Sequence, residues 1–259
     1  MRILITNDDG ISAPGLAVAE AIAAEVAGEA GEVWVVAPVF EQSGVAHCVS
    51  YIRPMRLEPL GPRRVAVEGS PADCVMAALY EIMKGNPPDL VLSGVNRGHN
   101  VGEDTLYSGT VGGAMEGALQ GLRAIALSQF YGAGTAGDPF GAARAHGADV
   151  VRRILAANIW EAHRYGVFYN VNFPARPPAE VRGIRATRQG HRPKPLFGVA
   201  PQIAPNRRTY LWLASTEGNE AADPGTDARE GADGYVTVTP LRADLTADDL
   251  VGPLGERLA

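Results

Sequence analysis

The sequence opens with MRILITNDDG at residues 1–10, and this stretch narrows the fold to one class. Ile3, Leu4 and Ile5 form an unbroken aliphatic run, which is typical of a strand buried on both faces of a parallel sheet. The NDDG that follows at residues 7–10 consists of residues favoured in turns, so the strand is expected to end there. A strand buried on both faces needs helices on either side, which predicts an α/β fold.

Two adjacent carboxylates, those of Asp8 and Asp9, come directly after this expected strand. Open α/β sheets bind their ligands beyond the carboxyl ends of the strands. Because the two charges repel each other, both stay ionised most easily when they are fully solvated or share a cation. Oxygen ligands favour Mg²⁺, Mn²⁺ or Ca²⁺ over zinc. These ten residues alone leave two interpretations open, a solvated turn and a cation site.

Length and composition describe an ordinary globular protein. The 259 residues suffice for one large α/β domain, with or without an appendage, and 46% of them are hydrophobic while 20% are charged. A formal net charge of −6 offers no long-range attraction to nucleic-acid phosphates or anionic lipid, so polymeric nucleic acid is not expected as a partner. No apolar run approaches the ~20 residues of a membrane span, so no membrane partner is expected.

The cysteines and the N-terminus indicate a cytoplasmic protein. Cys48 and Cys74 are far apart and form no CxxC, so neither a disulfide framework nor a zinc site is suggested. Reduced thiols in the cytosol are the expectation. The apolar run before Asp8 is too short for the hydrophobic region of a secretory signal.

Strand and helix patterns alternate through residue 160, which is the order of a parallel sheet covered by helices. Further strands are expected at 32–38, 88–96 and 124–130, with a short piece at 65–69 inside an irregular region at 49–69. Helices are expected from Pro14 to about Val26, from Ser70 to about Met83, and from Phe140 to about Ala157. A further helix is expected to begin within residues 108–110.

In such a sheet the loops after parallel strands meet at one edge, which carries Asp8 and Asp9. Ser43 lies in the loop after the second expected strand, and Asn96 ends a later one. The Ser-Gly-Thr at residues 108–110 begins a helix rich in small residues, and a helix N-terminus of this kind can bind an anion. Taken singly, Ser43 and Asn96 are typical turn residues, and the convergence of three strand ends is what favours a site.

The pattern changes after Tyr165. Strands are expected at 167–174, 184–190, 209–214 and 234–240, separated by Pro- and Gly-rich stretches at 192–208 and 217–234. Loops this long protrude or bind. The region also holds a basic cluster, Arg185, Arg188, Arg192, Lys194, Arg207 and Arg208. These charges could approach an anionic substrate, but a solvated arm or a subunit contact is favoured, and an oligomerisation arm is the expectation.

Six motifs along the chain together resemble those of one family. They are ITNDDGISAPG at 5–15, VVAP at 35–38 followed by SG at 43–44, EGSPADCV at 68–75, SGVNRGHNVGEDTLYSGTVGGAMEG at 93–117, NVNFP at 170–174, and GTDA at 225–228 followed by GYVTVTPL at 234–241. The chain resembles, essentially end to end, the SurE family of stationary-phase survival proteins, which act as metal-dependent 5′-nucleotidases. The NDDG motif alone is weak evidence for this family, whereas the six motifs together are specific for it.

The resemblance implies a Rossmann-like three-layer domain with a mostly parallel sheet over residues 1–165. A strand-rich extension follows over 166–259, with a protruding arm that exchanges with a second subunit in a homodimer or dimer of dimers. It implies one divalent ion, Mg²⁺ or Mn²⁺, and no organic cofactor. The implied metal ligands are Asp8, Asp9, Ser43 and Asn96.

The implied reaction is hydrolysis of nucleoside 5′-monophosphates to nucleoside and phosphate, with nucleoside 3′-monophosphates and short polyphosphate as secondary substrates. Asp8 and Asp9 are the expected catalytic residues, and one of them orients the attacking water. Expected phosphate and substrate contacts are Asn96, Asn100, Ser108, Gly109 and Thr110, with Tyr107 as a further candidate. His99 is more typical of a solvated loop residue than of a general acid.

Some residues depart from the pattern, and other interpretations stay open. Val39, Phe40 and Glu41 stand where many relatives carry polar or basic residues, which bears on substrate preference. A non-catalytic nucleotide or metal sensor would use the same pocket. A dinucleotide-dependent oxidoreductase is disfavoured because the first loop lacks GxGxxG. Asp8 as a covalent nucleophile is disfavoured because no D-x-D spacing is present at this pair.

Overall fold

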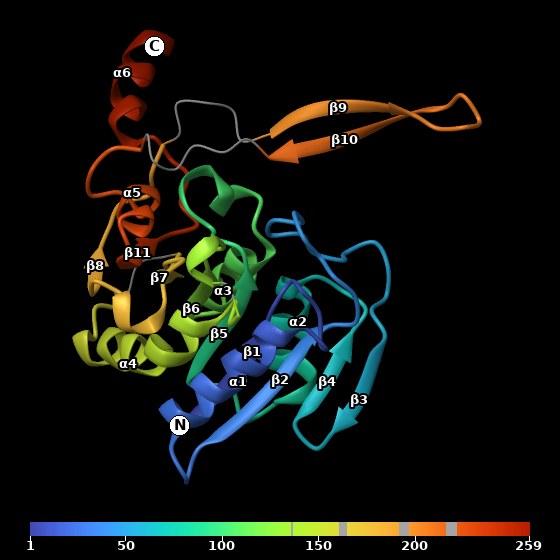
Figure 1. Ribbon diagram of the computed structural model, residues 1–259, viewed down its shortest axis with the longest axis vertical. Helices are drawn as coiled ribbons and strands as arrows, with labels where there is room; N and C mark the ends of the chain where they lie inside the picture. Colours follow the sequence, from blue (N-terminus) through green and yellow to red (C-terminus); the bar gives the residue numbers. More distant parts are fainter. Residues whose placement is uncertain (136, 161–164, 192–196, 216–221) are drawn as a thin grey trace.

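The computed structural model describes residues 1–135, 137–160, 165–191, 197–215 and 222–259. Arg192 and Lys194 of the basic cluster lie outside the described residues. A twisted sheet forms the centre of the molecule, and helices pack against both of its faces (Figure 1). The hairpin β9–β10 and the helix α6 project from this body. Among the described residues, no helix has the length and apolar character needed to cross a membrane.

Nine strands of the described residues form the central sheet, in the order β3-β4-β2-β1-β5-β6-β7-β11-β8. They are β1 (Arg2–Thr6), β2 (Glu32–Pro38), β3 (Leu57–Gly61), β4 (Arg64–Val67), β5 (Leu90–Arg97), β6 (Arg123–Gln129), β7 (Phe168–Phe173), β8 (Ile184–Ala186) and β11 (Val236–Leu241). The six consecutive strands β4-β2-β1-β5-β6-β7 are parallel to one another. β3 is antiparallel to β4, and β11 is antiparallel to β7. The prediction of an α/β fold with a mostly parallel sheet is confirmed.

In the described parts of the chain, six α-helices accompany the sheet. They are α1 (Pro14–Ala27), α2 (Pro71–Ala77), α3 (Gly109–Leu119), α4 (Gly141–Ala157), α5 (Asp227–Ala232) and α6 (Asp248–Leu258). Four shorter turns of helix are η1 (Ala78–Ile82), η2 (Gly102–Leu106), η3 (Ala133–Thr135) and η4 (Pro178–Glu180). The helix expected from Ser70 to Met83 is thus α2 followed by the π-helical turn η1, and the side chain of Ser70 caps its start.

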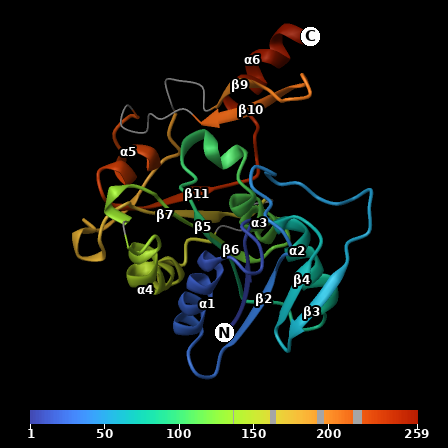
Figure 2. The ribbon, with the colours of Figure 1, turned by 45° about the vertical axis from the view of Figure 1, so that its right-hand side comes forward.

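The first strand is buried on both faces, as its aliphatic run predicts. Ile3 and Ile5 pack into the core beneath α1 and α4, and Leu4 packs into the core beneath α2 and α3. All three side chains are fully buried. Figure 2 shows the two helix pairs on either side of the sheet, which makes three layers. Successive side chains of a strand point to opposite faces, so an unbroken apolar run fills both cores.

The segment after residue 165 adds to the same sheet. β7 pairs parallel to β6, β11 pairs antiparallel to β7, and β8 pairs parallel to β11. Phe168 and Phe173 at the two ends of β7 are buried in the two different cores. The expected boundary at residue 165 therefore falls just before a strand of the central sheet.

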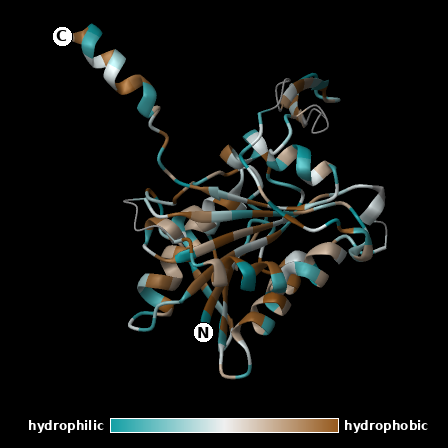
Figure 3. Ribbon diagram, turned by 90° about the vertical axis from the view of Figure 1, so that its left-hand side faces the viewer, coloured by the Kyte–Doolittle hydropathy of each residue, from teal (hydrophilic) through white to brown (hydrophobic). Residues whose placement is uncertain are grey.

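Two elements lie in stretches that were expected to be irregular, and a third was not expected. Residues 192–208 contain β9 (Phe197–Ile203), which pairs antiparallel with β10 (Thr209–Ser215), so the prediction of an irregular stretch was wrong there. Pro201 is tolerated in this strand because a two-stranded ribbon consists of edges. The stretch 217–234 likewise contains α5, and α6 was not predicted at all; it stands away from the body (Figure 3).

Gly15 is required where α1 crosses β5. A Cβ atom on Gly15 would lie 2.0 Å from the carbonyl oxygen of Val95, next to Asn96. Gly15→Ala should therefore push α1 from the sheet and lower the free energy of unfolding in urea by about 1–3 kcal/mol. Gly252→Ala in α6 is the matched control, because nothing lies within 4 Å of that Cβ position. It should leave stability unchanged or raise it by up to ~1 kcal/mol. Equal effects of the two substitutions would contradict this packing argument.

Candidate metal and phosphate site

Hydrogen bonds within the turn after β1, and one from the loop after β2, fix the conformation of this turn. The side-chain amide of Asn7 donates to the carbonyl of Gly10 at 2.9 Å, and Gly10 has a φ of +99°, which favours glycine. The backbone amide of Gln42 donates to the carbonyl of Asp8 at 2.6 Å. These contacts place Asp8 and Asp9 at the carboxyl edge of the sheet, where the sequence predicts them.

The N-terminus of α3 packs directly against Asp8. The hydroxyl of Thr110 donates to Oδ1 of Asp8 at 2.5 Å, and both residues are buried. A Cβ atom on Gly109 would lie 2.8 Å from Cβ and 3.0 Å from Oδ2 of Asp8, so only glycine permits this approach. Ser108 caps the helix by accepting from the amide of Val111 at 3.1 Å. The positive end of the helix favours a carboxylate or a phosphate here.

Burial makes the two carboxylates costly to ionise without a cation. Desolvation raises the pKa of Asp8 to about 6, and the charge of Asp9 adds to this, while the hydrogen bond from Thr110 acts against it. Burial also raises the pKa of Asp9; the backbone amide of Arg97 lowers it, and the charge of Glu41 raises it. Two adjacent carboxylates in this state gain stability from a shared cation, so the pair fits a metal site.

The chain neighbours of Asn96 and Ser43, which are Arg97 and Gln42, contact the acidic pair through their backbone amides. The residue after Asn96 donates its backbone amide to Oδ2 of Asp9 at 3.1 Å. Asn96 uses its amide nitrogen on the carbonyl of Gly98 at 2.9 Å, which leaves the oxygen as the end suited to a cation. Ser43 follows Gln42, which contacts Asp8, but its hydroxyl donates to Glu41 at 2.8 Å. Their roles as ligands stay predictions.

The predicted ligands of a metal ion at this site would all offer oxygen atoms. Within the part of the chain that the structure describes, no three His, Cys, Asp or Glu side chains cluster in a way that could hold a metal. Ligands beyond the two aspartates would therefore be the Asn96 amide and the Ser43 hydroxyl. Such a set suits a hard ion such as Mg²⁺ or Mn²⁺.

Asn100, predicted as a substrate contact, is tied into the protein interior. Its side-chain amide donates to the hydroxyl of Ser128 at 2.8 Å, and its backbone amide donates to Asn172 at 2.7 Å. Its carbonyl accepts from the side chains of Asn170 at 2.7 Å and Asn172 at 3.1 Å. All four residues are buried, so Asn100 anchors the loop after β5 to β6 and β7. The NVNFP motif supplies both β7 asparagines.

His99 and Tyr107 pack within the same loop region. The His99 ring stacks on Phe130 with centroids 4.4 Å apart and planes 16° apart, and its Nε2 lies 3.5 Å from Asp104. Tyr107 is half exposed and meets the Phe197 ring edge-on at 5.2 Å, at the start of β9. We call the hairpin β9–β10 the arm, and it begins beside the loop that leads into α3.

Sequence reasoning missed Asp227, which binds the backbone of the loop between β5 and α3 at Gly102. Its carboxylate is fully buried and accepts from the backbone amides of Gly102 at 3.1 Å and Gly190 at 2.7 Å, and from Ala228 at 2.8 Å. Burial raises its pKa, and the three amides act against that shift. The GTDA motif, ahead of a buried strand, was the available signal. Asp227 joins the first helix turn of α5 to the loop at η2.

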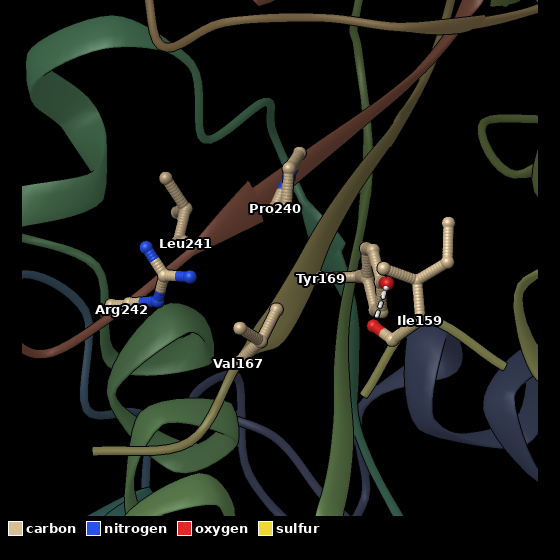
Figure 4. A pocket seen from close by; sticks show the side chains of 6 residues that line it. All are labelled: Ile159, Val167, Tyr169, Pro240, Leu241 and Arg242. Atoms are coloured by element: carbon tan, nitrogen blue, oxygen red, sulfur yellow. Dashed lines mark hydrogen bonds between the residues drawn. The ribbon is translucent and has the colours of Figure 1, made fainter. Parts of the chain in front are cut away.

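A separate pocket of about 210 Å³ lies at the opposite edge of the sheet (Figure 4). It lies beside the start of β7 and the end of β11, and its lining consists of Ile159, Val167, Tyr169, Pro240, Leu241 and Arg242. The hydroxyl of Tyr169 donates to the carbonyl of Ile159 at 2.5 Å. This pocket has no carboxylate in its lining, so the acidic pair and the α3 N-terminus remain the candidate site.

Comparison with known proteins identifies the family. The family model of the survival protein SurE matches residues 3–195. The chain is 59% identical over 256 residues to the 5′-nucleotidase SurE of Ruegeria pomeroyi, covering 98% of both chains, and 56% identical over 262 residues to that of a Jannaschia species, covering 100% of both. The crystal structure of the SurE protein from Aquifex aeolicus matches the fold with a TM-score of 0.81 at 35% identity, covering 100% of both chains. Because these matches span most or all of the chain, it belongs to the SurE family.

Proposed function

We propose that this chain is a 5′-nucleotidase, a phosphomonoester hydrolase that converts nucleoside 5′-monophosphates to nucleoside and phosphate with one divalent ion, Mg²⁺ or Mn²⁺. The observation that carries the proposal is the acidic pair packed against the N-terminus of α3. The relatives named 5′-nucleotidase SurE support the substrate class. Nucleoside 3′-monophosphates and short polyphosphate are secondary substrates in this proposal. The cytoplasmic location and the lack of an organic cofactor stay predictions.

Each site residue has a chemical role in the proposed reaction. Asp8, Asp9, Ser43 and Asn96 would hold the ion, which when bound polarises a phosphate oxygen and acidifies a water. The backbone amides at the start of α3 would bind phosphate oxygens, because they point out of the helix end and lack helical partners. Asp9 is more exposed than Asp8 and has its second oxygen free of the Arg97 amide, so it would orient the attacking water.

Two exposed apolar elements support a homodimer or dimer of dimers. In β9–β10 the large side chains Val199, Ile203, Leu211, Trp212 and Leu213 are each at least 60% exposed. The helix α6 exposes Leu250, Val251, Leu254 and Leu258 and touches solvent along its whole length. Contiguous apolar surface on projecting elements marks an interaction site. The proposed occupant is a second copy of the chain, which would cover both elements.

Replacing Asp9 should abolish turnover. Asp9→Asn removes a charge from the cation site, so its phosphate release from AMP in Mn²⁺ should be about 100-fold or more below that of the native protein. Removing the metal from the native protein with EDTA should lower phosphate release by a similar factor. Asp149→Asn is the matched control, because Asp149 is an exposed carboxylate paired with Arg153 on α4. It should keep full activity. AMP binding that requires Mn²⁺ without any phosphate release would instead favour a nucleotide sensor.

The raised pKa of Asp8 should appear in the stability of the cation-free protein. The folded state keeps a proton on Asp8 up to about pH 6, whereas the ordinary value is 3.8. The stability that this proton provides is complete below pH 3.8 and is lost as the pH rises through 6, by roughly 3 kcal/mol. In EDTA, the stability of the native protein relative to Asp8→Asn should therefore fall across this window in urea unfolding. Parallel stability profiles of the two proteins would contradict the buried state of Asp8.

Polar substitutions on the arm should lower the oligomeric state. Leu211 and Leu213 are 67% and 71% exposed, and they lie on the same face of β10. The double substitution Leu211→Ser, Leu213→Ser should shift the mass in light scattering toward that of the monomer, with unchanged circular dichroism. Leu60→Ser is the control, because Leu60 is 50% exposed on the edge strand β3, outside the arm. An unchanged mass would place the subunit contact elsewhere.

A further inference from the structure

Arg97 places a cationic side chain beside the acidic pair. It is the last residue of β5, and its backbone amide donates to Oδ2 of Asp9 at 3.1 Å. Its guanidinium carbon lies 5.3 Å from the centroid of the Tyr131 ring. Arg97 pairs in register with Gln129 of β6, two residues before Tyr131. The end of β5 and the segment just after β6 thus hold the arginine and the tyrosine together at the edge that carries the site.

The guanidinium charge of Arg97 reaches the site without forming a direct ion pair with a carboxylate of the described residues. The charge of Arg97 acts on the pKa of both Asp9 and Tyr131, and the charge of Asp9 also acts on Tyr131. Among the described residues, no carboxylate oxygen lies within 4 Å of the Arg97 side-chain nitrogens. An exposed cation–π contact is worth only about 0.5–1 kcal/mol. The arginine is therefore held in place weakly and remains able to bind an anion.

The charges at the site call for a cation of this kind. Asp8, Asp9 and Glu41 bring three negative charges when ionised, and a divalent ion supplies two positive ones. A phosphate monoester near neutral pH brings almost two further negative charges. The N-terminus of α3 offsets roughly half a charge. Without another cation, the substrate would enter a site of its own sign, because the ion alone does not balance the three carboxylates.

We propose that Arg97 binds the phosphoryl group of the substrate from the Asp9 side, while the N-terminus of α3 binds it from the Asp8 side. Tyr131 is a positioning residue that holds the guanidinium near Asp9 before substrate arrives. This inference rests on the proposed function, and it makes the phosphate, not the nucleoside, the group that Arg97 recognises. A planar guanidinium donates two parallel hydrogen bonds to a phosphate, and these strengthen as charge builds up on the phosphoryl oxygens.

Steady-state kinetics with two substrates test the inference. Arg97→Ala should lower kcat/KM by about 30-fold or more for both AMP and phenyl phosphate in Mn²⁺, and Arg97→Lys should recover part of the loss. Tyr131→Leu should lower activity about 3-fold or more, and Tyr131→Phe, which keeps the ring, should recover most of that loss. Arg123→Ala is the matched control, because that guanidinium lies 5.8 Å from the Trp160 ring at the other end of β6.

Calorimetric titration of inorganic phosphate separates this inference from the proposed function. In Mn²⁺, Arg97→Ala should weaken phosphate binding by about 10-fold relative to the native protein and to Arg123→Ala, whether or not AMP is hydrolysed. Native protein that binds phosphate without turnover would overturn the proposed hydrolase alone. Equal phosphate affinity of Arg97→Ala and Arg123→Ala would overturn the inference. So would a loss of activity on AMP with none on phenyl phosphate, because it would assign Arg97 to the nucleoside.

Discussion

The contact between Asp8 and the first turn of α3 is the constraint on which the site depends. It joins the end of β1 to a helix that begins about a hundred residues later, through the Thr110 hydroxyl and the missing side chain of Gly109. The contact buries the Asp8 carboxylate, and this burial together with the charge of Asp9 raises the pKa of Asp8. A bound cation would relieve this cost. The same geometry brings the positive end of α3 to the place where an anion would meet that cation.

The segment after residue 165 anchors the loop that leads from β5 to α3. β7 offers Asn170 and Asn172 to the backbone of Asn100, and α5 offers Asp227 to the backbone of Gly102. Both anchors lie in the loop that runs from β5 to α3. The strand-rich extension therefore continues the sheet and also fixes the loop that carries the site. The arm starts at Phe197, against Tyr107 of the same region, so a subunit contact on the arm would lie close to the site.

The order of strands and helices in the first half of the chain was predictable because the signals there are local. The aliphatic run at Ile3–Ile5 and the Pro at the start of α1 act within a few residues. The strand β9 was missed because Pro and Gly normally interrupt strands, and only its pairing with β10 makes it regular. The helix α6 was missed because Gly252, Pro253 and Gly255 lower its helix propensity.

The sequence by itself determined that two carboxylates follow a buried strand and that serine, asparagine and a helix start can join them at one sheet edge. Turn residues after apolar runs encode this, and parallel connections bring the loops together. The tertiary structure decided which side chains turn toward the pair. Asn100 points to Ser128 instead, and Arg97 lies over Tyr131 beside Asp9. These outcomes depend on hydrogen bonds and packing between residues far apart in the chain, which no local pattern specifies.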